Sequence, residues 1–327
     1  MSFVRNAFQT MHPLAQIVML GCIVLTCMAL GTGVGVLWLS MAHGTDPTAL
    51  TQAGAMTRDS MIVLNNANQL VAFLVASLAF GALVGFSFLG RFALKRPRAM
   101  MLLLAVLLAL GMSPMLDFSY RLNEWMLVPG SSIHSWAGAL EAQAMAMTRT
   151  MLTFDHGGQV LGVLFAVGLL PALCEEWLFR GTLQPILVRA TGNIHLSVWL
   201  AAALFSAIHM QFFGFIPRML LGAIFGYLVA FSGSLWPAVL GHFVNNAGVV
   251  LAAWWMGAEW LDEGLDPQPL DAWGMADWGM AVVALLALGW GLRTLFSRGD
   301  ADGYLSSFNL EAKPSVQTPL QSQGPQA

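Results

Sequence analysis

Long apolar segments recur along most of this chain, and they constrain its fold more than any other feature. About 20 consecutive apolar residues in a helix cross the hydrocarbon core of a bilayer. Hydrophobic residues make up 57% of the 327 residues and charged residues only 9%, a balance typical of integral membrane proteins. We therefore predict an all-α, polytopic membrane protein with about eight transmembrane helices around a buried polar site. The predicted helices lie near 14–41, 61–89, 99–116, 157–188, 195–210, 216–231, 235–255 and 275–294.

These helices are expected to form one membrane domain, residues 1–298, in which no second, soluble unit is visible. The first apolar segment is too long for a signal-peptide core and is interpreted as a retained helix. Residues 299–327 are rich in Ser, Gln and Pro and are predicted to be a disordered cytoplasmic tail. Cys22, Cys27 and Cys174 lie in apolar segments without zinc-like or disulfide-like spacing, so we interpret them as packing residues.

Basic residues between the second and third predicted helices indicate the orientation. The stretch "GRFALKRPRA" (90–99) contains four Arg and Lys residues, which favours the cytoplasmic side. The loop 257–273 has no Lys or Arg and falls on the outer side by the same helix count. Both termini are then cytoplasmic, and we predict a multi-pass protein of the cell membrane, in a bacterial inner membrane. The net charge of −3 gives no indication of nucleic acid as a partner.

Residues 117–156 form a longer stretch on the predicted outer side. Within it, "WAGALEAQAMAMTRTML" (136–152) has the pattern of an amphipathic helix lying in the membrane interface. An ordinary helical connector between two spans fits the same residues equally well.

Ionisable side chains inside the predicted helices carry the chemistry. Each costs roughly 2.5–3.5 kcal/mol in a bilayer on insertion scales, so such residues mark function. They collect in three places, which are "EEWLFR" (175–180), "FSAIH" ending in His209, and "HFVNN" with His242 and Asn246.

Helical spacing assigns partners within the first motif. Glu176 and Arg180 are four residues apart and lie on one helix face, so they are predicted to form a structural ion pair. Glu175 has no cation at helical spacing and is left free. Pro171 precedes Glu175 by four residues and is expected to free a backbone carbonyl and bend the helix.

The expected depth of each residue in the membrane predicts that the three motifs lie close together. Glu175 and His209 each lie 17 residues from Gly192, the centre of a predicted turn, so they should face each other. After the turn "SGS" (232–234), His242 and Asn246 follow at a shallower but comparable depth. We predict one buried site of carboxylate, two imidazoles and amide. The alternative is that these groups only hold helices together by hydrogen bonds.

The motifs resemble those of the intramembrane CPBP family, which joins CAAX prenyl endopeptidases with bacteriocin-processing, Abi-type proteins. That family's pattern is Glu-Glu-x-x-x-Arg, then Phe-x-x-x-His (here Phe205 and His209), then His-x-x-x-Asn or Asp. All three occur here in order, within a catalytic core of about residues 157–250. The resemblance implies an all-helical fold, hydrolysis of peptide bonds within the membrane, and Glu175 as the catalytic carboxylate.

Two mechanisms fit these residues. In the first, Glu175 activates a water, His209 helps to hold it, and His242 and Asn246 stabilise the oxyanion. In the second, Glu175, His209 and His242 bind a catalytic zinc with an open water position. The family is commonly labelled a metalloprotease, yet the chain lacks HExxH, and the first mechanism is favoured.

Other functional classes remain as alternatives. A proton-coupled transporter would also place Glu and His in the middle of the membrane, but paired repeats and broken helices are not evident. A non-proteolytic scaffold or immunity protein of the same fold would keep these residues without cleaving anything. For the protease, the expected partners are membrane lipids and a membrane-associated peptide or protein substrate.

Overall fold

Helices account for all the regular structure in the part of the chain that can be described. The computed structural model describes residues 8–300, except 9, 45, 47, 49–55, 85–94, 129, 260 and 262–273, together with Gly303 and Tyr304. No strand occurs among these residues. The predicted all-α class is therefore confirmed.

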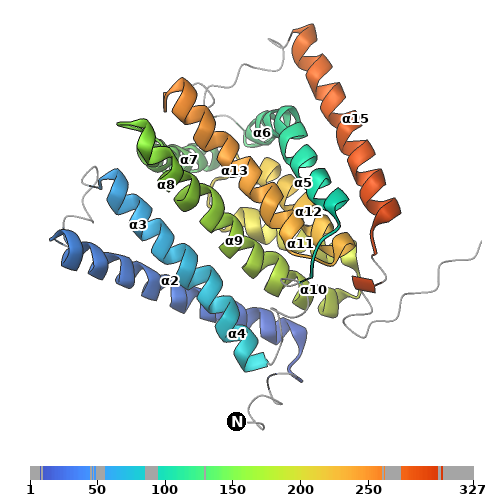
Figure 1. Ribbon diagram of the computed structural model, residues 1–327, viewed down its shortest axis with the longest axis horizontal. Coiled ribbons are helices and arrows are strands. Elements are labelled where there is room, and N and C mark those ends of the chain that lie inside the picture. The colour runs from blue at the N-terminus through green and yellow to red at the C-terminus, as the bar shows by residue number, and fades with distance from the viewer. Residues whose placement is uncertain are drawn as a thin grey trace, which may run out of the picture.

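Two amino-terminal helical rods pack side by side at one edge of the molecule (Figure 1). The first is α2 (Pro13–His43). The second runs from α3 (Arg58–Asn68) through a π-helical stretch, Gln69–Val75, into α4 (Ala76–Val84). The π-helical stretch contacts the central helix of the molecule, so this pair is positioned to add side chains to the interior.

The third predicted helix, 99–116, is two helices in the structure. These are α5 (Ala99–Gly111) and α6 (Ser113–Met126), which are bent by 49° relative to each other. Pro114 lies in the first turn of α6, where its missing N–H cannot continue the hydrogen bonding of α5. The prediction of one straight span was therefore wrong at this point.

Residues predicted as an interfacial helix or a connector form α7 (Ser132–Met151). Ser131 caps this helix by accepting a hydrogen bond from the backbone N–H of His134. α7 packs against α3, and both helices contribute residues to the cavity described below.

One long helical run, Gly157–Thr191, passes through the centre of the molecule (Figure 1). Two π-helical stretches, Leu164–Leu169 and Trp177–Leu183, interrupt its regular α-helical bonding. The α-helical parts are α8 (Val160–Val163), α9 (Leu170–Glu176) and α10 (Gln184–Thr191).

The remaining helices reverse direction at glycine turns, as predicted. Gly192 and Gly233 both adopt left-handed backbone conformations, with φ of 63° and 62°, which glycine reaches without steric cost. α12 packs against both α11 and α13. The helices of this part are α11 (Ile194–Ala207), α12 (Phe215–Ser232), α13 (Trp236–Met256) and α15 (Met275–Arg298).

The structure does not confirm the predicted count of eight transmembrane helices. Six helices in the described part are long and apolar enough to span a membrane, or seven if α5 and α6 form one bent span. The fifth predicted helix, 195–210, is α11, with only 14 residues. At about 1.5 Å per residue it is shorter than a bilayer core of about 30 Å. These spans define a multi-pass membrane protein.

Several predictions fall outside the described residues. Residues 90–94 of the basic stretch lie there, as do most of the loop 257–273 and nearly all of the tail 299–327. The orientation of the chain, its cytoplasmic termini and its bacterial inner membrane therefore stay predictions.

Candidate active site

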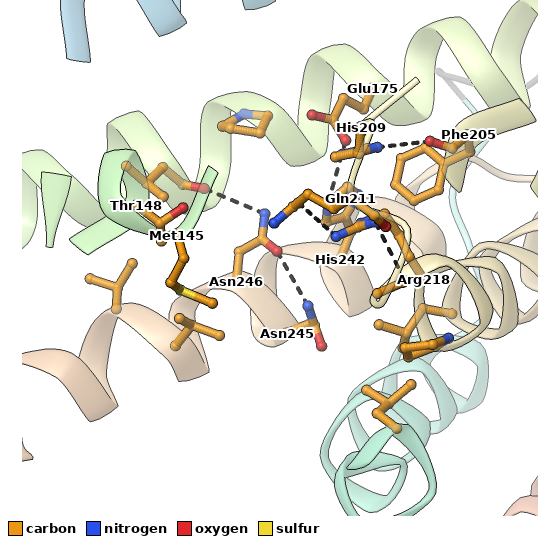
Figure 2. A pocket seen from close by; sticks show the side chains of 18 of the residues that line it. Met145, Thr148, Glu175, Phe205, His209, Gln211, Arg218, His242, Asn245 and Asn246 are labelled. Atoms are coloured by element: carbon orange, nitrogen blue, oxygen red, sulfur yellow. Dashed lines mark hydrogen bonds and ion pairs between the residues drawn. The ribbon is translucent and has the colours of Figure 1, made fainter. Parts of the chain in front are cut away.

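A cavity of about 520 Å³ lies among the central helices and collects polar side chains from six of them and one turn. Its volume falls within the usual range for small-ligand sites. All four residues predicted to be catalytic line this cavity, and Figure 2 shows them together. The polar lining consists of Asn65, Gln69, Tyr120, Glu141, Thr148, Glu175, His209, Gln211, Arg218, His242, Asn245 and Asn246.

Glu175 is held in the cavity wall by α9, and its carboxylate is buried. Its Oε1 accepts a hydrogen bond from Nε2 of Gln69 at 2.8 Å. Its Oε2 lies 3.8 Å from Nε2 of His242, too far for a direct hydrogen bond. One oxygen is therefore fixed by the protein, and the other faces an imidazole across a gap that suits a shared water.

Glu176 and Arg180 form a fully buried ion pair, with Oε1 and Nη1 2.7 Å apart. Nη2 of Arg180 also donates to the backbone carbonyl of Gly222 at 2.8 Å. The guanidinium carbon lies 4.7 Å from the ring centroid of Phe205, a cation–π contact. Arg180 thus ties α12 and α11 to the helix that carries both glutamates.

Glu176 also binds His242, which the sequence reasoning did not anticipate. Its Oε1 lies 2.8 Å from Nδ1 of His242. An ionised carboxylate only accepts hydrogen bonds, so Nδ1 donates to Glu176 and Nε2 is left for the cavity. Phe225 stacks on the ring at 5.5 Å, and Phe205 meets it edge-on at 5.9 Å. The imidazole is fixed on several sides.

His209 lies on a turn rather than on the predicted helix 195–210, because α11 ends at Ala207. The chain bends sharply there, and Met210 adopts a positive φ of 54°. Nδ1 of His209 donates to the carbonyl of Phe205 at 2.8 Å. This bond leaves Nε2 for the cavity that the residue lines.

Asn246 lies one turn beyond His242 on α13, and its amide is already engaged. Nδ2 donates to the carbonyl of Val167 at 3.4 Å, and Oδ1 accepts from Asn245 at 3.3 Å. Val167 precedes Pro171 by four residues, and proline has no N–H to donate to that carbonyl. The carbonyl that Pro171 was expected to free is therefore a partner of Asn246.

π-helical stretches adjoin the site on two helices. Glu175 and Glu176 lie between the stretches 164–169 and 177–183, and Gln69 begins the stretch 69–75. Each π-turn shifts the helix face and so changes which side chains point inward. Such irregularities are frequent at functional sites.

Gln69 is the main residue of this site that sequence reasoning missed. It lies on the amino-terminal helices, far in sequence from the three motifs. The available signal was its place in "NNANQL" (65–70), where four amide side chains interrupt an otherwise apolar helix. Glu141, Gln211 and Arg218 were missed as well and are discussed below.

The alternative zinc site is not formed as a ligand set in this structure. Among the residues described, no three His, Cys, Asp or Glu side chains are grouped so that they could hold a metal ion. Gln69, Glu176 and Phe205 bond to Oε1 of Glu175 and to Nδ1 of His242 and of His209, which leaves Oε2 and both Nε2 atoms to the cavity. Since the described residues form no ligand set, we derive no catalytic step through a metal.

The fold and the site define a class: a multi-pass helical membrane protein with paired glutamates and two histidines around a buried cavity. One family model matches part of the chain. Residues 157–248 match the model described as type II CAAX prenyl endopeptidase Rce1-like. This match supports the resemblance to the CPBP and CAAX protease family that the motifs predicted. No curated protein and no solved structure matches the chain.

Proposed function

We propose that this protein is an intramembrane endopeptidase that cleaves membrane-associated peptides or proteins with a water activated by Glu175. The observation that carries the proposal is the gap of 3.8 Å between Oε2 of Glu175 and Nε2 of His242. A water in this gap can donate one proton to each group. The family match at residues 157–248 supports peptide hydrolysis as the reaction.

In this mechanism Glu175 is the general base. Gln69 holds Oε1, so Oε2 is the oxygen that takes the proton from water as it attacks the peptide carbonyl. Glu175 then returns this proton to the leaving amine, and the carboxylate is regenerated.

The histidines differ in how they are held. His242 is fixed by Glu176 through Nδ1, a carboxylate–imidazole arrangement that sets the tautomer and stabilises a protonated ring. To stabilise the developing oxyanion, Nε2 of His242 has to take up a proton from solvent, after which it donates to the oxyanion instead of accepting from the water. His209 is tied to a backbone carbonyl, and its Nε2 helps to hold the attacking water.

The proposed role of Asn246 at the oxyanion needs a change of partner. Its amide nitrogen donates to Val167 at 3.4 Å, a long and weak bond. A substrate oxyanion would be a stronger acceptor and would compete for the same N–H. Asn246 is thus an oxyanion donor that has to release the carbonyl of Val167 when substrate binds.

The test is a comparison of cells that express the wild-type chain with cells that express Glu175→Ala. Mass spectrometry of the membrane fraction and of released peptides should find fragments that appear only with the wild type. The melting temperature of purified Glu175→Ala, compared with that of the wild type, separates loss of folding from loss of chemistry. An identical set of peptides in wild type and Glu175→Ala would contradict an endopeptidase and favour a scaffold.

A further inference from the structure

The cavity holds one cation among its described lining residues, and the mechanism above does not use it. This cation is Arg218, in the first turn of α12, which lines the same cavity as Glu175 and His209. Figure 2 shows its side chain beside Gln211 and below His242. The presence of a guanidinium in the same cavity as the proposed catalytic carboxylate requires an explanation.

Neutral oxygens are the hydrogen-bond partners of Arg218. Nη2 donates to Oε1 of Gln211 at 2.7 Å, and Nη1 lies 3.4 Å from the backbone carbonyls of Gln211 and Gly214. Within the described chain, no carboxylate lies within 4 Å of its nitrogens. Its charge is therefore not paired in direct contact, which is unfavourable for a partly buried cation.

The nearby carboxylate of Glu141 is kept from Arg218 by an amide. Gln211 donates from Nε2 to Oε1 of Glu141 at 3.3 Å and accepts from Arg218 through Oε1. Glu141 therefore lowers the electrostatic cost of burying the Arg218 cation without accepting any of its hydrogen bonds. Guanidinium has five N–H donors, and these contacts leave some of them for another acceptor.

Helix stability does not explain the position of Arg218 either. A cation in the first turn faces the positive end of the helix dipole, which is unfavourable. Gly214 at the amino-terminal end of α12 provides no side-chain cap, and the first turn holds no acidic residue. An anion at this place would be favoured by both the guanidinium and the helix end.

We propose that Arg218 binds a carboxylate of the peptide substrate and thereby sets which peptide bond reaches Glu175. The inference rests on the proposed endopeptidase activity. The carboxylate is either the free carboxyl terminus of the substrate or an Asp or Glu side chain close to the cleaved bond. Arginine binds both in the same way, by two parallel N–H bonds to one carboxylate.

A second role for Arg218 has to be separated from this one. Its bonds to Gln211 and Gly214 hold the turn that follows His209, so a substitution could disturb that histidine. Loss of positioning would lower the cleavage of every substrate alike. Loss of carboxylate binding lowers the cleavage of substrates whose carboxylate binds Arg218 and leaves the cleavage of other substrates unchanged.

The experiment uses the full chain in liposomes and a mixture of random peptides with an amino-terminal acyl anchor. Each peptide is supplied with a carboxyl-terminal acid or a carboxamide, and mass spectrometry gives the rate and place of cleavage. The proteins compared are wild type, Arg218→Gln, Arg218→Lys and the control Arg149→Gln. Arg149 is a cation of α7 that does not line the cavity.

If the carboxyl terminus is the ligand, the wild type should cleave acids about tenfold to a hundredfold faster than carboxamides, as for one charged hydrogen-bonded pair. Arg218→Gln should reduce this ratio to about one, Arg218→Lys should keep part of it, and Arg149→Gln should keep it whole. If a side chain is the ligand, cleaved carboxamides should be enriched in Asp or Glu at a fixed distance from the bond. Arg218→Gln should then remove the enrichment.

Two results would overturn the inference. One is equal loss of acid and carboxamide cleavage in Arg218→Gln with any enrichment in Asp or Glu unchanged, which would leave only a role in holding the turn. The other is a wild type without preference for a carboxylate in either position. A binding measurement tests the site even if the proposed activity fails and nothing is cleaved. Acid peptides should then raise the melting temperature of the wild type but not that of Arg218→Gln, and carboxamides should raise neither. Equal stabilisation by both, whether or not the peptides contain Asp or Glu, would refute it.

Discussion

Nδ1 of His242 lies 2.8 Å from Oε1 of Glu176, and the same oxygen lies 2.7 Å from Nη1 of Arg180. The glutamate that helical spacing assigned to a structural pair thus also orients an imidazole of the candidate site. The two adjacent glutamates have different roles, because Glu175 lines the cavity and Glu176 orients His242 toward that cavity. This division gives Glu176 two separable effects, on stability and on rate.

The stability effect is expected from a cycle of substitutions at positions 176 and 180. Glu176→Ala leaves a buried guanidinium unpaired and should cost roughly 3–5 kcal/mol of unfolding free energy. The double variant Glu176→Ala with Arg180→Ala should lose less than the sum of the two single losses. Denaturation of the four proteins in detergent measures this coupling, and strict additivity would show that the ion pair contributes nothing.

Gln69 should matter for rate more than for stability. Gln69→Leu keeps the size of the side chain but removes the hydrogen bond to Glu175, so kcat should fall about tenfold to a hundredfold. Asn68→Leu is the matched control, since Asn68 bonds to Thr32 and to the carbonyl of Leu64, away from the cavity lining. A Gln69→Leu enzyme with wild-type kcat would mean that Glu175 needs no positioning from the amino-terminal helices.

Removal of metal ions should leave the activity unchanged. The described residues hold no group of three suitable ligands, and the proposed mechanism needs only the protein's own carboxylate and imidazoles. Purified protein treated with a strong chelator should keep its cleavage rate within about twofold, well below the effect of losing a catalytic group. A rate that collapses on chelation and returns with zinc would instead favour Glu175, His209 and His242 as ligands.

Glu141 predicts a pH dependence of stability. Burial raises the pKa of this carboxyl, and Arg218 opposes the rise. The folded protein therefore favours the neutral form, and its stabilising effect is complete below the ordinary pKa of about 4.5. That effect is lost as the pH rises through the raised folded value. The melting temperature of Glu141→Gln relative to that of the wild type should thus rise between pH 4 and neutral pH, and a constant difference would contradict this.

Sequence reasoning predicted most of the helices and the gathering of the motif residues. Apolar length gave the helical class, and the turn at Gly192 placed Glu175 and His209 on one cavity. These predictions worked because membrane helices are long and their reversals are marked by glycine. The polar residues were visible because polar groups are rare in such segments.

What sequence reasoning missed comes from contacts that no local pattern specifies. Gln69 reaches Glu175 across a separation of 106 residues. The bend between α5 and α6 and the early end of α11 reduce the number of full spans in the described part of the chain to six or seven. The second bond of Glu176 to His242 depends on helix rotation, which the π-helical stretches on either side of the two glutamates change.

The central claim is that Glu175 does the chemistry, and Glu175→Gln tests it most directly. Glutamine keeps the shape of the side chain and removes the base. The measurement is kcat on a cleaved peptide together with the melting temperature, for wild type and Glu175→Gln prepared in parallel. We predict that cleavage falls to background while the melting temperature stays within a few degrees of wild type. A Glu175→Gln enzyme that still cleaves at a wild-type rate would contradict the account.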